Sequence, residues 1–269
     1  MFDNVMAQKA AENLKNVREK RPLVHNITNL VVMNFTANAL LACGASPVMA
    51  HAPEEVEEMV SFAGALVLNI GTLTPYWISS MLKAGKRANE LKVPIVLDPV
   101  GSGATALRTQ SAKRIIDELD ISVVRGNASE VLSLAQDESR TKGVDAIHSV
   151  DEAADAAGQL ARELGIPLAI TGAVDLVTDG SRVCRVSNGH ELMGYVTGTG
   201  CAATALIGAF LAVDASTLEA ATTALAYFGL AGEKAAREAN APGSFQVGLL
   251  DALFSIDEAA LREGAKIQG

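Results

Sequence analysis

The sequence predicts an α/β protein with a central, mostly parallel sheet, helices on both faces of that sheet, and an antiparallel hairpin at one edge. Short runs that are apolar on both faces, such as residues 65–71, alternate with longer helical stretches, which is typical of buried parallel strands. Ala, Val, Leu, Ile and Gly dominate, and only 4% of the residues are aromatic, which favours helices packed closely on a sheet. Because 269 residues are a normal length for one α/β domain, we expect residues 1–269 to form a single domain.

Helices are predicted where apolar residues recur with helical spacing between turn-forming residues. Gly44 ends one helix, and Pro53 begins another with Glu54 and Glu55 in its first turn, where acids match the helix dipole. The predicted helices span residues 6–20, 31–43, a stretch from 53, 75–91, 104–119, 128–135, 151–164, 202–210, 218–239 and 245–254. A polar segment at residues 136–148 is expected to connect two of them.

Strands are predicted where short apolar runs precede a polar loop. The runs span residues 23–29, 46–50, 65–71, 93–97, 121–124 and 167–171. The two runs that follow, residues 175–177 and 183–186, flank an Asp179-Gly180 turn and are predicted to form the antiparallel edge hairpin.

Charge and composition exclude several classes of function. A formal net charge of -9 argues against general binding to nucleic acid or anionic membranes, which depends on clustered Lys and Arg. No apolar run reaches the roughly 20 residues that span a bilayer. Residues 1–22 are charged throughout, without the apolar core of a secretory signal, and the three cysteines lack metal-type spacing, so we expect a cytoplasmic protein. The four histidines lie far apart and predict no zinc site.

The stretch Gly198-Thr199-Gly200-Cys201 precedes a run of small apolar residues that has the pattern of a buried helix. Glycines allow a tight turn, and the first N–H groups of the helix have no partner within it. These groups and the helix dipole together favour an anion such as phosphate. Glycines in front of a helix are also common as simple turn residues, so this stretch alone leaves both interpretations open.

Polar residues follow three predicted strands at the point where each strand ends, which is where ligands bind in an open parallel sheet. Asp98 follows one strand, Arg125 and Glu130 follow the next, and Thr171 ends a third. Each of these residues alone is more often a cap or a turn former. Together with the glycine turn they describe a phosphotransferase without a Walker A sequence, with Asp98 and Glu130 holding Mg²⁺ through water and Arg125 neutralising phosphate.

Five motifs carry a resemblance to a known family. They are Asp98-Pro99-Val100-Gly101, Arg125-Gly126-Asn127-Ala128-Ser129-Glu130, Thr171-Gly172 followed by Asp175, Gly198-Thr199-Gly200-Cys201, and Pro242-Gly243-Ser244-Phe245. In this order and spacing the chain resembles the hydroxyethylthiazole kinases, the thiamin-salvage members of the ribokinase-like superfamily. Residues 25–29 and 42–49 also fit that family, and Ser102 stands where we expect alanine.

The resemblance implies ATP-dependent phosphorylation of 4-methyl-5-(2-hydroxyethyl)thiazole by a homotrimer whose active sites lie between subunits, on a ribokinase-like fold. It assigns Met49 and Gly198 to the thiazole, with Asn26 contributed by the neighbouring subunit. It assigns Arg125, Thr171, Asn127 and Gly200 to ATP, and Asp98 and Glu130 to Mg²⁺. Cys201 stands where most ribokinase-like enzymes have an aspartate base. A helix N-terminus lowers the pKa of such a thiol and nearby phosphates raise it, so the sequence leaves the direction open.

Two alternatives remain at this point. A kinase for a pyrimidine alcohol or a related vitamin precursor would keep the fold and the phosphate site, and would differ around Met49 and Asn26. The other alternative is a nucleotide-binding regulatory protein without turnover. The filled set of acid, Arg and Gly positions argues against it, and an assay of ADP release would separate the two.

Overall fold

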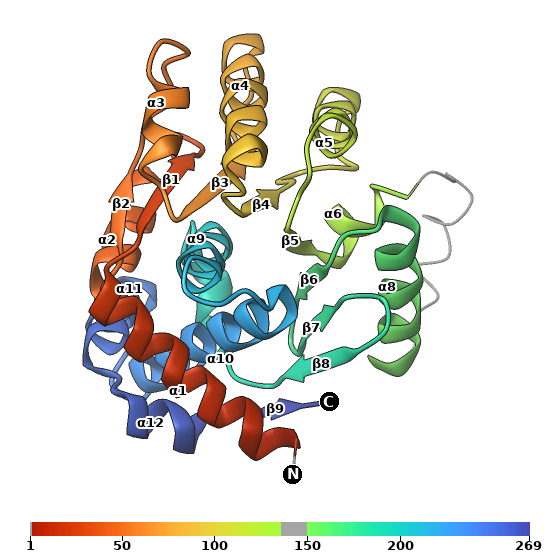
Figure 1. The fold of residues 1–269 in the computed structure, drawn as a ribbon. Coiled ribbons are helices and arrows are strands. Elements are labelled where there is room, and N and C mark those ends of the chain that lie inside the picture. Colours follow the sequence, from red (N-terminus) through yellow and green to blue (C-terminus); the bar gives the residue numbers. More distant parts are fainter. Residues whose placement is uncertain (1, 136–149) are drawn as a thin grey trace.

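The computed structural model describes residues 2–135 and 150–269, and within them one nine-stranded sheet forms the centre of the protein. Its strand order is β2-β1-β3-β4-β5-β6-β7-β8-β9 (Figure 1). The first six strands in this order pair in parallel, and the pairs β6–β7, β7–β8 and β8–β9 are antiparallel. The strands are β1 Leu23–Ile27, β2 Ser46–Val48, β3 Ala65–Asn69, β4 Ile95–Asp98, β5 Val123–Asn127, β6 Leu168–Thr171, β7 Asp175–Thr178, β8 Val183–Val186 and β9 Ile267–Gln268.

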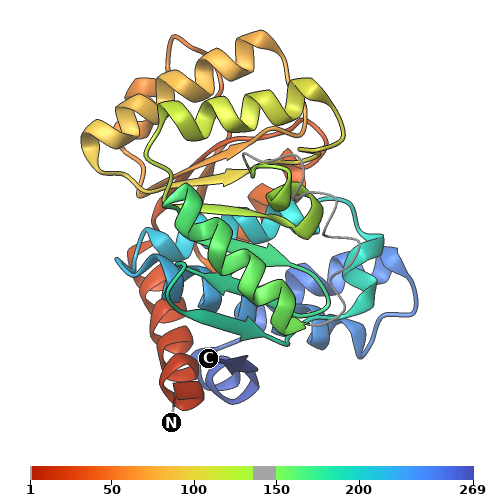
Figure 2. The same ribbon diagram turned by 90° about the vertical axis from the view of Figure 1, so that its right-hand side faces the viewer.

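Helices cover both faces of the sheet (Figures 1 and 2). One face carries α3 Val56–Ser61, α4 Pro75–Leu91, α5 Ala106–Glu118, α6 Ala128–Leu132 and α8 Val150–Leu164. The other face carries α1 Phe2–Lys20, α2 Met33–Cys43, α9 Thr199–Leu211, α10 Thr217–Ala236, α11 Pro242–Ser255 and α12 Glu258–Gly264, with the short 3₁₀ helix η2 Glu191–Tyr195 in front of α9. The predicted α/β class, parallel sheet and antiparallel edge are confirmed.

The continuous apolar runs arise because successive strand residues face different cores. Val67 packs into the core beneath α9, while Leu66 and Leu68 pack into the core on the opposite face. All three side chains are buried, so no position on β3 is left for a polar residue until Asn69 at its end. This is the pattern expected of a strand covered on both faces.

Helix α9 lies directly on the centre of the sheet, against β1, β3 and β4. Its residues from Ala202 to Leu211 are all buried, and at Gly208 an added Cβ would lie 2.9 Å from Cγ2 of Val67. The glycine therefore permits a close approach of helix and sheet. This contact fixes where the N-terminus of α9 lies relative to the strand ends.

The structure differs from the predicted elements in a few places. Residues 53–55 form a turn, in which the N–H groups of Glu55 and Val56 donate to the carbonyl of Ala52, so α3 begins at Val56 and not at Pro53. Strand β5 continues through Asn127, so Arg125 lies within it. Helix α12 and strand β9 are not predicted by the sequence pattern, and β9 lies outside the predicted hairpin. The predicted polar connection at residues 136–148 lies outside the described residues.

None of the helices in the described ranges is both long and apolar enough to cross a bilayer.

Candidate active site

The carboxyl ends of β3, β4, β5 and β6 meet the N-terminus of α9, and their polar residues gather there. Asp98 ends β4 and is completely buried. Its Oδ2 accepts hydrogen bonds from Nδ2 of Asn69 at 2.8 Å and from Oγ1 of Thr204 at 2.7 Å, and it lies 3.7 Å from Nη1 of Arg125. Burial raises the pKa of Asp98, and the charge of Arg125 opposes that rise. Its second oxygen, Oδ1, is buried without a hydrogen-bond partner.

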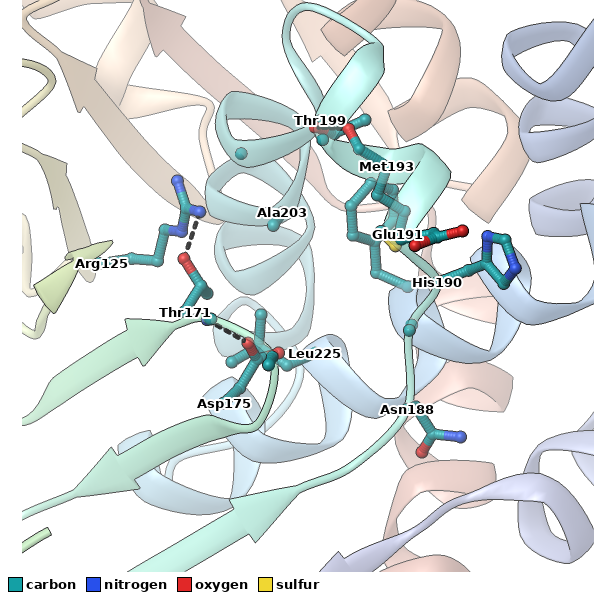
Figure 3. Close-up of a pocket in the computed structure, with 17 residues that line it drawn as sticks. Arg125, Thr171, Asp175, Asn188, His190, Glu191, Met193, Thr199, Ala203 and Leu225 are labelled. Atoms are coloured by element: carbon teal, nitrogen blue, oxygen red, sulfur yellow. Dashed lines mark hydrogen bonds between the residues drawn. The ribbon is translucent and has the colours of Figure 1, made fainter. Parts of the chain in front are cut away.

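Arg125 connects Asp98 to the neighbouring strand. Its Nη2 donates to Oγ1 of Thr171 at 2.5 Å (Figure 3), and only 9% of the residue is exposed. The first turn of α9 packs against the guanidinium, because an added Cβ at Gly200 would lie 2.7 Å from Nη1. Glycine at position 200 therefore leaves room for the guanidinium, which a larger residue would displace; the residue does not have the positive φ that a glycine turn suggests. The positive φ occurs at Gly198, the residue that precedes the helix, where it is +93°.

Cys201 lies beside Asp98 with its sulfur accepting from two amides. Nδ2 of Asn69 is 3.2 Å from Sγ, and Nδ2 of Asn29 is 3.5 Å from it. Burial and the nearby charge of Asp98 raise the pKa of this thiol to about 11. The sequence left open whether the pKa of Cys201 is raised or lowered, and the structure shows that it is raised. The thiol is therefore neutral at physiological pH.

Glu130 and Asn127 form a reciprocal cap at the start of α6. The Asn127 side chain accepts from the Glu130 N–H, and Oε2 of Glu130 accepts from the Asn127 N–H, both at 2.9 Å. Oε1 of Glu130 also accepts from the Gly101 N–H at 2.8 Å. Glu130 therefore connects the loop after β4 to the end of β5, in addition to any role towards a metal.

A pocket of about 510 Å³ opens between these strand ends and α10 (Figure 3). Arg125, Thr171 and Gly200 line one end of it. The remainder is lined by apolar side chains, notably Met193, Leu225 and Phe228, and by polar ones, among them Asn188, His190 and Glu191. A volume in the range of about 300–1,000 Å³ with a few convergent polar groups is typical of a small-molecule site.

Asp175 is a further acid in the wall of this pocket (Figure 3). Its Oδ1 accepts from the Gly172 N–H at 2.9 Å. Burial raises the pKa of Asp175 to about 6, against the lowering effect of that hydrogen bond and of the charge of Arg125. Asp175 belongs to one of the family motifs, but the sequence alone assigns it no role.

Asn26 and Met49 lie elsewhere, at the end of the sheet formed by β1 and β2, and neither lines the pocket. Asn26 is buried, its Nδ2 donates to the carbonyl of Val24 at 2.9 Å, and its Oδ1 has no hydrogen-bond partner. Met49 is half-buried directly after β2. Of the predicted site residues, Arg125, Thr171 and Gly200 line the pocket. The structure places Asp98, Gly198, Cys201, Asn127 and Glu130 beside them, outside its lining, and leaves Asn26 and Met49 farther away, in β1 and just after β2.

Sequence reasoning missed three residues that contact the predicted ones. Asn69 lies inside the predicted strand 65–71, so the rule that selects Asp98 passes it by; the strand actually ends at Asn69. Thr204 lies one helical turn beyond Gly200, which points it to the same side, but only if the register of α9 is known. Asn29 belongs to a polar loop whose direction the sequence does not give.

The described residues contain no cluster of three or more His, Cys, Asp or Glu that could hold a metal ion. Mg²⁺ in kinases is commonly held by one or two carboxylates together with substrate phosphates and water. Asp98 fits such an arrangement because its Oδ1 is buried without a partner. Each oxygen of Glu130 accepts one N–H and retains capacity for a further hydrogen bond from a water molecule.

The model of the Hydroxyethylthiazole kinase family matches residues 14–259. The chain belongs to the hydroxyethylthiazole kinase family. It is 66% identical over 259 residues to a hydroxyethylthiazole kinase of Desulfotalea psychrophila, an alignment that covers 96% of this chain and 95% of that protein. Kinases of this family are phosphotransferases, so ATP is the co-substrate and a small molecule is the acceptor.

Solved structures give the same family and the same fold. The hydroxyethylthiazole kinase protein from Pyrococcus horikoshii OT3 superposes with a TM-score of 0.89 at 53% identity, over 96% of this chain and 98% of that one. A ribokinase-like superfamily protein from Enterococcus faecalis has a TM-score of 0.66 at 13% identity, over 88% and 87% of the two chains. The second likeness concerns the fold alone. It confirms the ribokinase-like architecture that the motifs implied.

The contact between Gly200 and Arg125 leads to a first prediction. In Gly200→Ala the new Cβ would displace the guanidinium, so we expect kcat to fall about 10- to 100-fold and KM for ATP to rise. Gly248→Ala is the control, because Gly248 lies on α11 outside this pocket and an added Cβ there would make only ordinary contacts, the nearest at 3.5 Å. It should stay within about twofold of the parent. Steady-state kinetics of both variants measure these effects. A folded Gly200→Ala variant with the parental kcat and KM for ATP would contradict the prediction.

The raised pKa of Asp175 leads to a second prediction. Between its unfolded pKa near 3.8 and its folded pKa of about 6, the native state binds the proton more tightly, so stability falls as pH rises through this range. Asp175→Asn removes this cost and keeps an acceptor for the Gly172 N–H. We expect a higher Tm than the parent at pH 7.5, by about 2–4 °C for each kcal/mol recovered, and a smaller difference at pH 4.

Thermal denaturation at both pH values measures this effect. Asp117→Asn, at an exposed position on α5, is the control and should leave Tm unchanged at both. A lower Tm for Asp175→Asn at pH 7.5 would contradict the assignment.

Proposed function

We propose that this chain transfers the terminal phosphoryl group of ATP to the hydroxyl group of 4-methyl-5-(2-hydroxyethyl)thiazole, the phosphorylation step of thiamin salvage, and that it does so as a single domain. Family membership supports the reaction. The observation that carries the proposal is the convergence of Arg125 and the N-terminus of α9 at one end of the 510 Å³ pocket, with the buried Asp98 carboxylate 3.7 Å from Nη1 of Arg125. This is a site for a phosphate chain, with space behind it that is lined by both apolar and polar side chains.

ATP would bind with its phosphates at the Arg125 end of the pocket and its base among Met193, Leu225 and Phe228. Arg125 and the Thr171 hydroxyl are already joined by a hydrogen bond, so both groups are oriented before a ligand arrives. Gly200 presents its N–H in the first turn of α9, where the helix dipole favours negative charge. Asn127 lies at the exposed start of α6 and would contact ATP at the rim of the site. Its side-chain oxygen already accepts from the Glu130 N–H, so the contact would come from its NH₂ group.

The N–H groups at the start of α9 would hold the transferring phosphoryl group. Phosphoryl transfer passes through a loose transition state, so most of the rate comes from positioning and charge neutralisation. Arg125 and α9 supply both. Cys201, in the same turn, would accept the proton of the acceptor hydroxyl. Only the thiolate form of Cys201 can take up this proton and become a thiol. Because the raised pKa makes the thiolate a minor species at physiological pH, it would assist only weakly and late in the reaction.

Asp98 and Glu130 would hold Mg²⁺ through water. Oδ1 of Asp98 has no hydrogen-bond partner, and both oxygens of Glu130 can accept a further hydrogen bond. The ion, when bound, supplies further neutralisation of phosphate charge. Asp98 also keeps Arg125 and Thr204 in place, and Glu130 keeps the Gly101 loop closed on α6.

The acceptor would bind between Gly198, Met49 and the Asn26 of a neighbouring subunit. An added Cβ at Gly198 would lie 3.0 Å from Cγ1 of Val32, so the start of α9 approaches the β1–α2 connection closely. In that connection Leu30 and Val31 are 63% and 73% exposed, although both are apolar. Exposed apolar residues beside the proposed acceptor site support a subunit interface there, and we propose a homotrimer with shared active sites.

Light scattering coupled to size exclusion should report three chains per particle. A fully active monomer would contradict the shared site and the role of Asn26.

The proposed reaction leads to a prediction on substrate choice. With ATP and Mg²⁺, we expect ADP release with hydroxyethylthiazole at a kcat/KM at least about 100-fold above that with hydroxymethylpyrimidine, because a pocket shaped for one alcohol discriminates through contacts at its reacting end. Coupled ADP detection and mass spectrometry of the phosphorylated product measure this. A preference for the pyrimidine would favour the alternative kinase, and nucleotide binding without ADP release would favour a regulatory protein.

The high pKa of Cys201 leads to a prediction on its side chain. Cys201→Ala should retain measurable turnover, since loss of general-base help costs about 10²- to 10⁴-fold at most. Cys201→Asp should equal or exceed the parent, because a carboxylate is ionised at neutral pH where the thiol is not. Cys184→Ala, which removes a buried thiol on β8, is the control and should keep the parental kcat. A folded, completely inactive Cys201→Ala variant would contradict the weak-base role.

A further inference from the structure

Asn69 lies at the centre of the hydrogen bonds that join the strand ends to α9. It ends β3 and is the register partner of Asp98 on β4. Only 1% of the residue is exposed. The motifs that identify the family do not include it, and none of the roles assigned above involves it.

The side chain of Asn69 uses all of its hydrogen-bonding capacity. Nδ2 donates to Oδ2 of Asp98 at 2.8 Å and to Sγ of Cys201 at 3.2 Å. Oδ1 accepts from Nδ2 of Asn29 at 2.9 Å and from the Gly71 N–H at 3.0 Å. A carboxylate only accepts and a backbone N–H only donates, so one orientation of the amide satisfies all four contacts.

The surroundings of Asn69 hold its amide in this orientation. Asn29 donates to Oδ1 of Asn69 and also to Sγ of Cys201, and its own Oδ1 accepts from the Val31 N–H at 3.1 Å. At Gly71, an added Cβ would lie 2.6 Å from Nδ2 of Asn29, so the loop after β3 packs directly on this amide. Side chains fixed in this way hold their partners in one geometry.

We propose that Asn69 is a positioning residue that fixes the Cys201 sulfur relative to the Asp98 carboxylate. The same NH₂ group donates to both atoms, so a single side chain sets the distance between the proposed base and the proposed Mg²⁺ site. Asp98 is held by Thr204 and Arg125 as well, whereas the only other side-chain donor to the sulfur in the described residues is the longer contact from Asn29. The orientation of Cys201 therefore depends on Asn69 more than that of Asp98 does.

This role rests on the proposed function, because Cys201 must face the acceptor hydroxyl. Asn69→Asp keeps the size and the acceptor oxygen of the side chain and removes both donors. Asn69→Leu removes donors and acceptor without adding a charge beside Asp98. In both variants we expect kcat to fall about 10- to 100-fold while KM for ATP changes less than about threefold, because the nucleotide contacts at Arg125 and Thr171 are untouched.

Asn13→Leu is the matched control. Asn13 is equally buried, and its Nδ2 also donates to two side chains, Asp214 at 2.8 Å and Thr223 at 3.0 Å, but it lies on α1 away from the pocket. Its loss should lower Tm and leave kcat at the parental value. A fall in kcat for Asn13→Leu like that for Asn69→Leu would mean that loss of a buried amide alone explains the effect, and would overturn the proposal.

A double-mutant cycle with Cys201→Ala tests whether Asn69 acts through the sulfur. If it does, the fold-loss in kcat caused by Asn69→Asp should be at least about threefold smaller in the Cys201→Ala background than in the parent. Equal losses in both backgrounds, or a folded Asn69→Asp variant with parental kcat, would overturn the proposal. The cycle is run with whichever alcohol the parent phosphorylates best, so a wrong acceptor assignment would appear in the parent's substrate profile and a wrong role for Asn69 only in the cycle.

Discussion

The buried carboxylate of Asp98 is the constraint on which the site depends. An ionised group inside a protein costs several kcal/mol unless charges and hydrogen bonds surround it. Here the partners come from three different elements: Asn69 at the end of β3, Arg125 on β5, and Thr204 on α9. Oδ2 of this carboxylate has all three partners only when these strands and this helix are in their native register. The order of the sheet and the assembly of the site therefore depend on each other.

Helix α9 converts this packing into a site for an anion. Its buried length lies on the sheet, and Gly208 sets how closely it does so. Its N-terminal turn then falls beside the Arg125 guanidinium, where Gly200 leaves room for the contact. The same helix therefore contributes to the hydrophobic core through its apolar face and to phosphate binding through its first turn. A shift of α9 along the sheet would therefore disrupt both the packing of the core and the phosphate site.

Much of the fold follows from local pattern, and much of the site does not. Parallel strands buried on both faces read as continuous apolar runs, and the residues that end them, Asp98 and Thr171, are found by position alone. The contacts of Asn69 and Thr204 depend on which strands are neighbours and on the rotation of α9, and no local pattern contains either. Strand β9 has two residues, too few for a periodicity, and its pairing with β8 is set by tertiary packing. The room that Gly200 leaves is occupied by the guanidinium of Arg125, a residue 75 positions earlier in the chain.

The central claim is that the first turn of α9 and Arg125 together hold the phosphates of ATP beside Cys201. A crystal structure of the protein with Mg²⁺ and a non-hydrolysable ATP analogue tests it most directly. The account predicts that the terminal phosphate lies within hydrogen-bond distance of the Gly200 or Cys201 N–H and of the Arg125 guanidinium, with the base against Phe228. A nucleotide bound with its phosphates away from α9, or with its base at the Arg125 end of the pocket, would contradict it.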